Sequence, residues 1–209
     1  MDETPKPQKA IPDRRLDMES LKALAHPLRV AIVDTLSTYG PFTASGLAER
    51  LGESSGATSY HLRQLEKHGF VREVAGRGTG RERWWERMPG TLNLNSTELP
   101  DTPANRAVTK TVVREWERSR SALLADFNER GYDLLPKEWI ASTDVATVNL
   151  RLTKEQLKEI VDKWDEFIDP IIEKYRGKSP VGSRPVQIQF NAFPVVDGEE
   201  TTDSVGGDE

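Results

Sequence analysis

The stretch SSGATSYHLRQLEKHGFV, from Ser54 to Val71, decides how the rest of the chain is interpreted. Thr58, Leu62 and Leu65 recur at intervals of three and four residues, which predicts an amphipathic helix with these side chains on its buried face. The opposite face is polar and partly basic. That face is either an ordinary solvated surface or a surface that contacts a partner, and the neighbouring sequence must decide between the two.

Three helical patterns precede this stretch. Apolar residues are spaced helically over Met18–Ala25. Because proline suits the first turn of a helix, a second helix should begin at His26–Pro27. A third should have Thr43 as its N-cap and Gly52 as its C-cap residue. A short polar turn then leads into the helix predicted over 55–69.

A glycine-rich segment follows that helix. Residues 71–75 and 81–87 are strand-like on either side of a tip with three glycines, which predicts a β-hairpin. Trp84 and Trp85 are adjacent on a strand and should point to opposite faces, so one of them packs on the core. Helices, a tight turn, a further helix and a hairpin, in this order, predict a winged helix-turn-helix.

The distribution of charge supports a contact surface in this region. The formal net charge of the chain is −5, but the tail 196–209 carries six acidic residues and no basic ones, so the remainder has a charge of +1. Residues 54–83 contain six Lys and Arg against three Glu, a local charge of +3. A locally basic segment suits a polyanionic partner such as nucleic acid.

Several classes of protein are disfavoured by what the sequence lacks. It contains no cysteine, which excludes disulfides, thiolate metal sites and thiol nucleophiles. No apolar run approaches the roughly 18–20 residues that span a bilayer, and the first residues do not form a secretory signal. No nucleophile–base pair, phosphate loop or carboxylate dyad stands out. We therefore expect a cytoplasmic, nucleoid-associated protein that is not an enzyme and needs no cofactor.

Residues 17–87 resemble the ArsR-like winged helix-turn-helix transcriptional regulators. The segments that carry the resemblance are LKALAHPLRVAIVDTL, TASGLAERLG, ATSYHLRQLEKHGFV and GRGTGRERWW. The resemblance implies a homodimeric transcription factor that binds double-stranded DNA at a roughly palindromic operator, often as a repressor.

The polar face of helix 55–69 and the hairpin tip provide the candidate DNA contacts. Small residues at the start of the helix permit close approach, and its free N–H groups favour a phosphate. Arg63 can donate two hydrogen bonds to a guanine edge, and arginines on the hairpin suit phosphates or a narrow minor groove. The predicted contact residues are Ser54, Ser55, Gly56, Ser59, Tyr60, His61, Arg63, Lys67, Arg77, Arg81 and Arg83.

Some of these residues also have a purely structural interpretation. Arg63 and Lys67 could belong to a solvated helix face, weakly paired with Glu66. His61 borders the buried face and could form hydrogen bonds only within its own domain. His26 lies on a different predicted helix from His61 and His68, and no cysteine or acidic cluster accompanies the three histidines, which argues against a metal-sensing site.

The fold class expected for the whole chain is mainly helical α+β. The DNA-binding domain should be followed by a helix-rich α+β region for dimerisation. The predicted limits are a disordered arm at 1–15, a winged helix-turn-helix domain at 16–88, a linker at 89–102, the C-terminal region at 103–194 and an acidic disordered tail at 195–209.

Two helices and two strands are predicted in the C-terminal region. Apolar residues at helical spacing predict a helix over 104–130 that ends at Gly131. Period-two alternation predicts strands over 145–152 and 185–193. These strands could pair within one chain or across a dimer.

The second of these helices should run over 154–176. It begins with a Thr-x-x-Gln capping box at Thr153–Gln156, and Pro170 inside it predicts a kink or break. Its apolar stripe, like that of 104–130, is more typical of a core or dimer interface than of a ligand site, although either could line a cavity for a small apolar effector. The predicted dimerisation residues are Val112, Trp116, Leu123, Phe127, Trp164 and Ile168.

A protein-interaction module is the alternative to a DNA-binding regulator. Winged helices also serve as docking domains, and the acidic tail could suppress DNA binding. Salt dependence separates these two functions, because binding to DNA weakens steeply as salt concentration rises.

Overall fold

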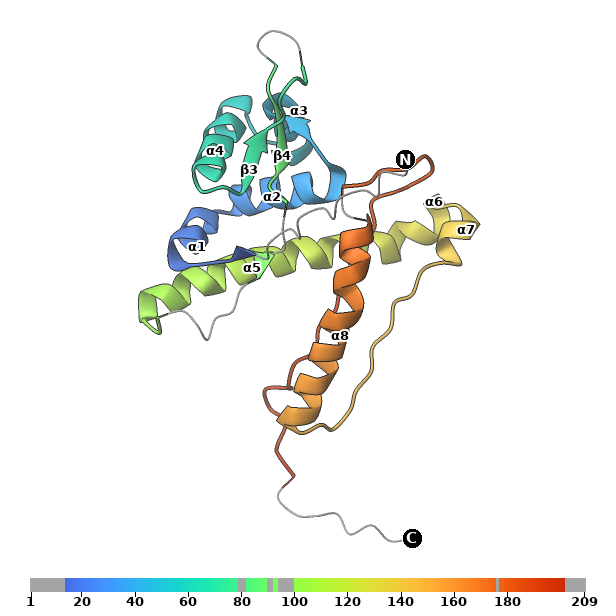
Figure 1. Cartoon of the computed structure of the whole chain (residues 1–209). Coiled ribbons are helices and arrows are strands. Elements are labelled where there is room, and N and C mark those ends of the chain that lie inside the picture. Colours follow the sequence, from blue (N-terminus) through green and yellow to red (C-terminus); the bar gives the residue numbers. More distant parts are fainter. Residues whose placement is uncertain (1–13, 79–81, 90–91, 94–99, 176, 202–209) are drawn as a thin grey trace, which may run out of the picture. The chain divides into compact units, whose positions relative to one another are not determined.

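The protein is described by a computed structural model, which is mainly helical with two small sheets (Figure 1). The described residues are 14–78, 82–89, 92–93, 100–175 and 177–201. The chain divides into two compact units, Met1–Asp144 and Val145–Glu209. The predicted N-terminal arm lies almost entirely outside the described residues, as does most of the predicted linker and tail.

The first unit holds all the strands that the structure contains among its described residues. Its helices and strands are β1 (Arg14–Arg15), α1 (Met18–Leu24), α2 (Pro27–Tyr39), β2 (Phe42–Thr43), α3 (Ala44–Leu51), α4 (Ser55–Lys67), β3 (Val71–Glu73), β4 (Trp84–Arg87), β5 (Leu92–Asn93), α5 (Pro103–Asp126), the π-helical turn η2 (Phe127–Gly131), α6 (Tyr132–Leu134) and α7 (Lys137–Ile140).

The helix boundaries follow local chemistry that the sequence reveals. His26 is the N-cap of α2, where its Nδ1 accepts a hydrogen bond from the Leu28 N–H at 3.2 Å. Thr43 caps α3 through a 3.0 Å bond from the Gly46 N–H to Oγ1. Gly52 ends α3 with φ +68°, in the left-handed region that favours glycine. These three caps are confirmed, while α4 ends two residues before the predicted limit.

One hydrophobic core joins the helices of this unit to β4. Side chains with almost no exposed surface come from α1, α2, α3 and α4 and from the start of β3: Leu21, Leu24, Ile32, Leu47, Leu62, Leu65, Phe70 and Val71. Val112 and Trp116 of α5 belong to the same cluster. The long helix therefore packs with the helix-turn-helix, whereas the sequence placed it in the C-terminal region.

The sheet of this unit is antiparallel, with strand order β2-β4-β3. Val71 pairs with Arg87 and Glu73 with Trp85, so β3 and β4 form the predicted hairpin. Trp85 is buried at 3% exposure, while Trp84 is half-buried, as expected for neighbours on opposite faces. A second pairing, parallel between β1 and β5, lies partly within the predicted linker.

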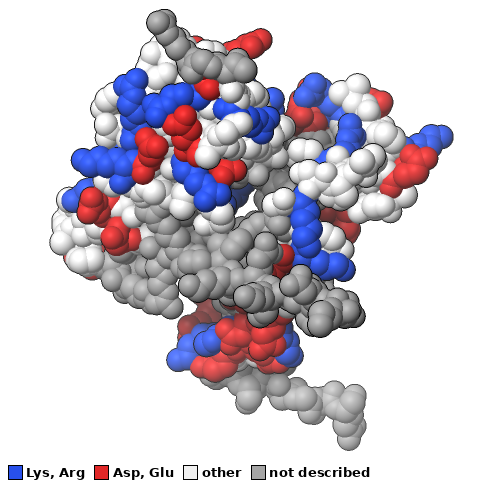
Figure 2. All heavy atoms as spheres, turned by 45° about the horizontal axis from the view of Figure 1, so that its top comes forward, with Lys and Arg blue, Asp and Glu red and all other residues white. Residues whose placement is uncertain are grey.

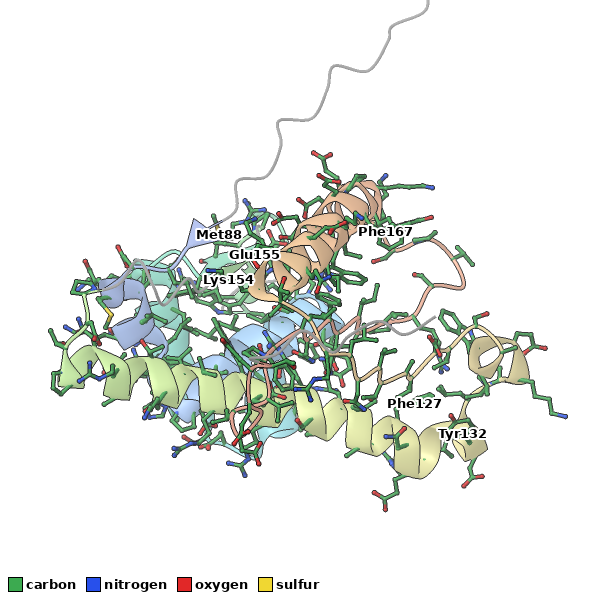
Figure 3. All side chains as sticks on the ribbon, turned by 90° about the horizontal axis from the view of Figure 1, so that it is seen from below. Met88, Phe127, Tyr132, Lys154, Glu155 and Phe167 are labelled. Carbon is green, nitrogen blue, oxygen red and sulfur yellow. The ribbon has the colours of Figure 1, made fainter. Side chains whose placement is uncertain are left out.

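The end of α5 contains a π-helical turn instead of a simple stop at Gly131. The Phe127 and Tyr132 rings lie side by side there, with centroids 5.4 Å apart (Figure 3). A Cβ on Gly131 would lie 2.6 Å from Cδ2 of Phe127, so a larger residue would displace that ring. Gly131 itself is helical, with φ −61° and ψ −43°, and the helical run continues through α6 to Leu134, so the predicted stop at Gly131 is wrong.

The second unit is built around α8 (Lys154–Tyr175). Its capping box is confirmed: the Thr153 N–H donates to Oε1 of Gln156 at 2.9 Å, and the Gln156 N–H donates to Oγ1 of Thr153 at 3.3 Å. The helix continues through Pro170, so the predicted break is absent. A proline removes one N–H donor, and here the helical turns on either side persist.

The two strands predicted in this unit are not formed. Residues 145–152 and 185–193 have no regular secondary structure and do not pair with each other. A strand requires a neighbour for its backbone groups, and the described part of a single chain does not supply one. Within the described residues, no helix is long and apolar enough to cross a membrane.

Candidate nucleic-acid interface

A buried hydroxyl holds α4 against α3. Thr58 has no exposed surface, and its Oγ1 lies 2.9 Å from the Ala44 carbonyl oxygen at the start of α3. The same hydroxyl also lies within hydrogen-bond distance of the Ser54 and Ser55 carbonyls. Together with the tight turn at Gly52, this contact fixes the angle at which α4 is presented.

The opposite face of α4 is open to solvent. Tyr60 is 55% exposed, and Arg63 and Lys67 are also exposed. Ser59 is half-buried between them. The buried and exposed faces of α4 therefore separate as the spacing predicted, and the exposed face carries the residues expected to contact a partner.

The start of α4 is also exposed. The Oγ of Ser54 accepts a hydrogen bond from the Ala57 N–H at 3.1 Å, so this hydroxyl serves as the helix N-cap. Ser55 and Gly56 follow it on the surface, and a Cβ added to Gly56 would meet only the Ser54 Oγ, at 4.0 Å. A close neighbour could thus reach this end of the helix.

His61 is placed differently from the other predicted contact residues. It is 9% exposed, and its ring lies 4.3 Å from that of His26, centroid to centroid. Its Nδ1 is buried without a hydrogen-bond partner among the described residues. Burial first, then the neighbouring His26 and Arg29, lower the pKa of His61. His61 therefore packs within the domain beside His26, unlike the exposed Tyr60 and Arg63, and its contact with DNA stays a prediction.

The hairpin positions its basic side chains on aromatic and acidic neighbours. The Arg77 guanidinium carbon lies 3.8 Å from the centroid of the Trp84 ring, a cation–π contact. Arg83 is held by Glu73, with Nη2 and Oε2 2.6 Å apart. Gly78, between them, has φ +95°, and a Cβ there would lie 2.4 Å from the Glu82 carbonyl oxygen, so only glycine fits. The third predicted arginine, Arg81, lies outside the described residues.

Sequence reasoning missed the partners of these arginines. Trp84 supports Arg77, and across the hairpin Arg72 and Glu86 form an ion pair at 2.7 Å. The cross-strand pairing of Arg72 with Glu86 follows from the register of β3 and β4, which could have been deduced only with the length of the hairpin loop known.

Basic and acidic side chains are interspersed over this part of the molecule. Figure 2 shows blue and red spheres alternating on the face that comes forward when the hairpin end is turned toward the viewer. On the hairpin, Glu73 and Glu86 therefore offset part of the positive charge of the arginines. In α4, Glu66 is the one acidic residue.

The predicted dimerisation residues are mostly covered by their own chain. Val112 has no exposed surface and Trp116 has 8%, because both pack in the core of the first unit. Leu123 and Phe127 are half-buried, as is Trp164, and Ile168 is 9% exposed. Val112 and Trp116 are thus occupied within their own chain, while a dimer contact through Leu123, Phe127 and Trp164 stays a prediction.

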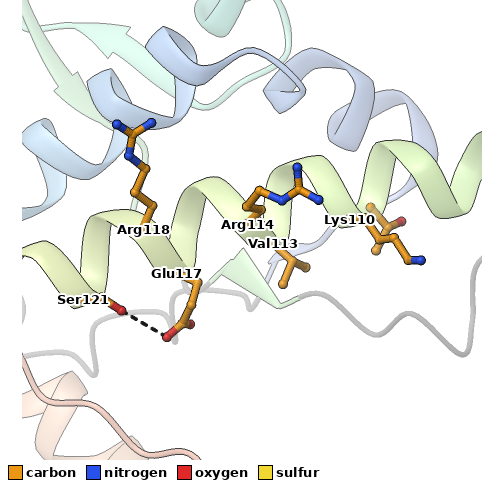
Figure 4. Close-up of a pocket in the computed structure, with 7 residues that line it drawn as sticks. Lys110, Val113, Arg114, Glu117, Arg118 and Ser121 are labelled. Atoms are coloured by element: carbon orange, nitrogen blue, oxygen red, sulfur yellow. Dashed lines mark hydrogen bonds between the residues drawn. The ribbon is translucent and has the colours of Figure 1, made fainter.

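A charged face of α5 borders a shallow hollow of about 660 Å³ (Figure 4). Val113 is the one apolar residue among those that line it, which are Thr109, Lys110, Val113, Arg114, Glu117, Arg118 and Ser121. The hollow is open to solvent and lies among charged residues, whereas a small-molecule site is usually an enclosed, mostly apolar cavity. Within the described residues, no three His, Asp or Glu side chains gather as a metal site would require.

Comparison with known proteins extends these observations. Among solved structures, the chain is similar to reduced HlyU from Vibrio cholerae, with 28% identity over 33% of this chain and 68% of that one (TM-score 0.29). It is also similar to the transcriptional repressor BigR from Xylella fastidiosa, with 19% identity over 56% of this chain and 84% of that one (TM-score 0.28). The transcriptional regulator Tm0710 from Thermotoga maritima shares 15% identity over 74% of this chain and 81% of that one (TM-score 0.29).

No curated protein matches the chain. A family model described as a helix-turn-helix domain matches residues 24–74, the segment that contains α2, α3, α4 and β3. The turn between α3 and α4, the buried face of α4 and the hairpin that follows agree with this match. Residues 24–74 therefore form a helix-turn-helix domain, and the β3–β4 hairpin gives the domain the fold of a winged helix.

Proposed function

We propose that the protein is a homodimeric transcriptional regulator that binds double-stranded DNA through α4 and the β3–β4 hairpin. One observation carries this proposal: α4 is fixed by a buried face and a buried hydroxyl while its other face presents Tyr60, Arg63 and Lys67 to solvent. A rigid helix with an exposed polar face is the element that winged helix-turn-helix proteins place in the major groove.

Each side chain on that face has a distinct role in the proposed complex. Arg63, in the middle of α4, donates two hydrogen bonds to a guanine edge. Tyr60 packs on a thymine methyl or reaches a phosphate. Lys67, near the end of the helix, contacts the backbone. At the other end, the N–H groups around Ser55 and Gly56 approach a phosphate.

The hairpin steadies the protein on the DNA backbone. Arg77 is exposed and lies on an aromatic face, so it can turn toward a phosphate or a narrow minor groove. Arg83 is paired with Glu73, so it contributes more to the hairpin than to the duplex. Arg81 completes the proposed contact set.

The resemblance of residues 17–87 to ArsR-like regulators supports the remaining parts of the proposal. A homodimer would place two copies of α4 on successive major grooves, which matches a roughly palindromic operator. By the same resemblance, the protein acts as a repressor, which prevents transcription while it occupies that operator.

Footprinting and anisotropy titrations on the DNA upstream of the protein's own gene test this proposal. The full-length protein should protect a roughly palindromic site. Arg63→Ala should weaken binding to that site by about 30-fold or more, because the dimer loses two bidentate base contacts of about 1–3 kcal/mol each. It should weaken binding to unrelated duplexes far less.

The matched control is Lys22→Ala, which removes one exposed positive charge from α1 instead of α4. It should leave the affinity for the protected site unchanged. If Arg63→Ala and Lys22→Ala behave alike, the assignment of α4 as the base-reading helix is wrong.

A further inference from the structure

The second unit exposes an unusual amount of apolar side-chain surface. Figure 1 shows two extended traces, one before and one after α8, and these are the segments 145–152 and 185–193. Apolar side chains occupy every second position in both. Their exposed fractions are 74% for Val148, 66% for Leu150, 42% for Leu152, 67% for Val186, 62% for Ile188 and 38% for Phe190.

The second unit also lacks a core of its own. Ile168 is the single buried residue among its described residues. Phe167, the neighbour of Ile168 on α8, is 60% exposed although its ring centroid lies 5.9 Å from that of Trp164 (Figure 3). Soluble monomers rarely expose contiguous apolar surface beyond a few hundred Å². A unit with one buried residue needs additional apolar surface from elsewhere to be stable.

The helix already covers part of one segment. The Trp164 ring is stacked on the Phe190 ring at 4.6 Å and an interplanar angle of 12°. The polar face of α8 is occupied by ion pairs within the helix, Lys158 with Asp162 and Glu159 with Lys163. What remains to be covered is the backbone edge and the rest of the apolar face of both segments.

The partner of these segments must itself be a β-strand. Both segments alternate with period two, yet neither pairs with another strand among the described residues. An added strand satisfies the backbone N–H and C=O groups and the apolar face together. A small apolar ligand would satisfy only the second of these.

The charges of the two segments favour a second copy of the same chain as that partner. Arg151 is the single charged residue in 145–152, and 185–193 has none. Arg151 lies on the polar side, where its Nη2 donates to the Glu199 carbonyl and to Oγ1 of Thr201 at 3.2 Å. Two copies can therefore approach through these segments without bringing like charges together, and a two-fold axis pairs each edge with its equivalent.

The surface is also close to the size that a dimer requires. A stable interface buries about 800 Å² on each partner, which corresponds to roughly 20 or more residues a side. The two segments contain 17 residues, among them Phe193, and Val195 follows them, so the surface approaches this size. Since every copy carries both segments, the matching surface is present wherever the protein is.

We infer that residues 145–152 and 185–193 form an intermolecular β-sheet with the same segments of a second copy, covered by α8 of each chain. This interface is distinct from the dimerisation residues expected on α5. The interface specifies how the two chains of the proposed dimer are held together, and in that respect this inference rests on the proposed function. The sheet itself does not depend on DNA.

Molar-mass measurements on the full-length protein test the interface. Light scattering and sedimentation at micromolar concentration should give about twice 23.5 kDa. The double variant Leu150→Asp with Ile188→Asp places a carboxylate on the apolar side of each segment and should raise the dimer dissociation constant at least 100-fold. The control, Asn149→Asp with Asn191→Asp, adds the same charge on the polar side and should remain dimeric. A monomeric wild type, or a first variant that stays dimeric, overturns the inference.

Engineered cysteines give a readout that a merely unfolded variant would not. Because the natural chain has no cysteine, single replacements along 147–151 and 187–191 report only their own neighbours. In an antiparallel two-fold pairing, positions near the axis should form covalent dimers on mild oxidation, and those two or more residues away should not. Glu49→Cys on α3 is the control. Absence of a covalent dimer at every position of both segments contradicts the shared sheet.

The two proposals can fail separately. A strand-linked dimer that binds no duplex would reject the proposed DNA binding and leave the sheet intact. A monomer, or a dimer whose mass is unaffected by Leu150→Asp with Ile188→Asp, would reject the sheet while footprinting could still support DNA binding.

Discussion

His61 is the residue whose environment differs most from the one expected for its type. His26 and Arg29 face it from the side of α2, the Tyr60 ring lies edge-on at 5.1 Å, and Glu53 is the acidic residue in its vicinity. Burial is the main reason that its pKa lies below the ordinary value of 6.5. The folded protein therefore favours neutral His61, while the unfolded chain takes up a proton near pH 6.5.

This difference predicts a loss of stability in mild acid. The contribution of neutral His61 is fully present above pH 6.5 and is lost as the pH falls from 6.5 through the lower pKa of the folded state. Urea unfolding at pH 7.5 and pH 5.5 should therefore show a drop in the free energy of unfolding that is smaller in His61→Gln, which cannot be protonated. Equal drops in both proteins would mean that His61 does not carry this dependence.

Thr58 shows what the sequence reveals about a single residue and what it does not. Helical spacing placed it on the buried face of α4, and it has no exposed surface. The hydrogen bond to the Ala44 carbonyl joins residues 14 positions apart and depends on how α3 crosses α4. Burial follows from local periodicity, whereas a specific partner follows from tertiary packing, and so only the first could be predicted.

At the scale of the elements, the connection from α3 into the first turn of α4 contains two glycines, Gly52 and Gly56, with different roles. Gly52 has φ +68° and open space around its Cα, so a side chain there would be strained only by the backbone. Gly56 lies in the first turn of α4, where a Cβ fits without a clash. One glycine is needed for conformation, and the other only weakens its helix.

Alanine substitutions should therefore change stability in opposite directions. Gly52→Ala should lower the free energy of unfolding by about 1 kcal/mol, because alanine rarely adopts the left-handed conformation. Gly56→Ala should raise it by up to about 1 kcal/mol through helix propensity. Thermal unfolding followed by circular dichroism measures both changes. If Gly56→Ala also weakens DNA binding, close approach at the start of α4 is supported as well. Equal shifts in melting temperature would refute this account of the turn.

The elements that were predicted correctly are those with local causes. The caps at Thr43 and Gly52 and the capping box at Thr153–Gln156 each join residues three or four apart. The strands at 145–152 and 185–193 were predicted from alternation alone, but their formation depends on a neighbour that the single described chain lacks. Similarly, the placement of α5 in the first unit depends on Val112 and Trp116 meeting a core that the linear pattern does not identify.

For the molecule as a whole, the distribution of charge matters more than its sum of −5. Acidic residues gather in the C-terminal tail, while the exposed face of α4 and the hairpin carry basic residues. If the protein binds DNA, its affinity must depend on the release of counterions from the phosphates that it contacts.

A steep dependence on salt is the expected result. With about three phosphate contacts per subunit in a dimer, the logarithm of the binding constant should fall with the logarithm of salt concentration with a slope of about −5. Arg77→Ala should reduce the magnitude of that slope by about 2, one contact from each subunit, whereas Lys22→Ala should not. Binding titrations at salt concentrations between 50 and 200 mM measure this slope, because affinity changes strongly over that range. A flat response would favour a docking module over a DNA-binding protein.

The stacking of Arg77 on Trp84 also makes the hairpin its own optical probe. A guanidinium 3.8 Å above an indole alters the polarity that the excited ring experiences. When the arginine turns toward a phosphate, the indole loses that cation, and its emission spectrum must respond. Because the chain has five tryptophans, binding at the hairpin could be followed without a dye as the part of the spectral change that Trp84→Phe abolishes.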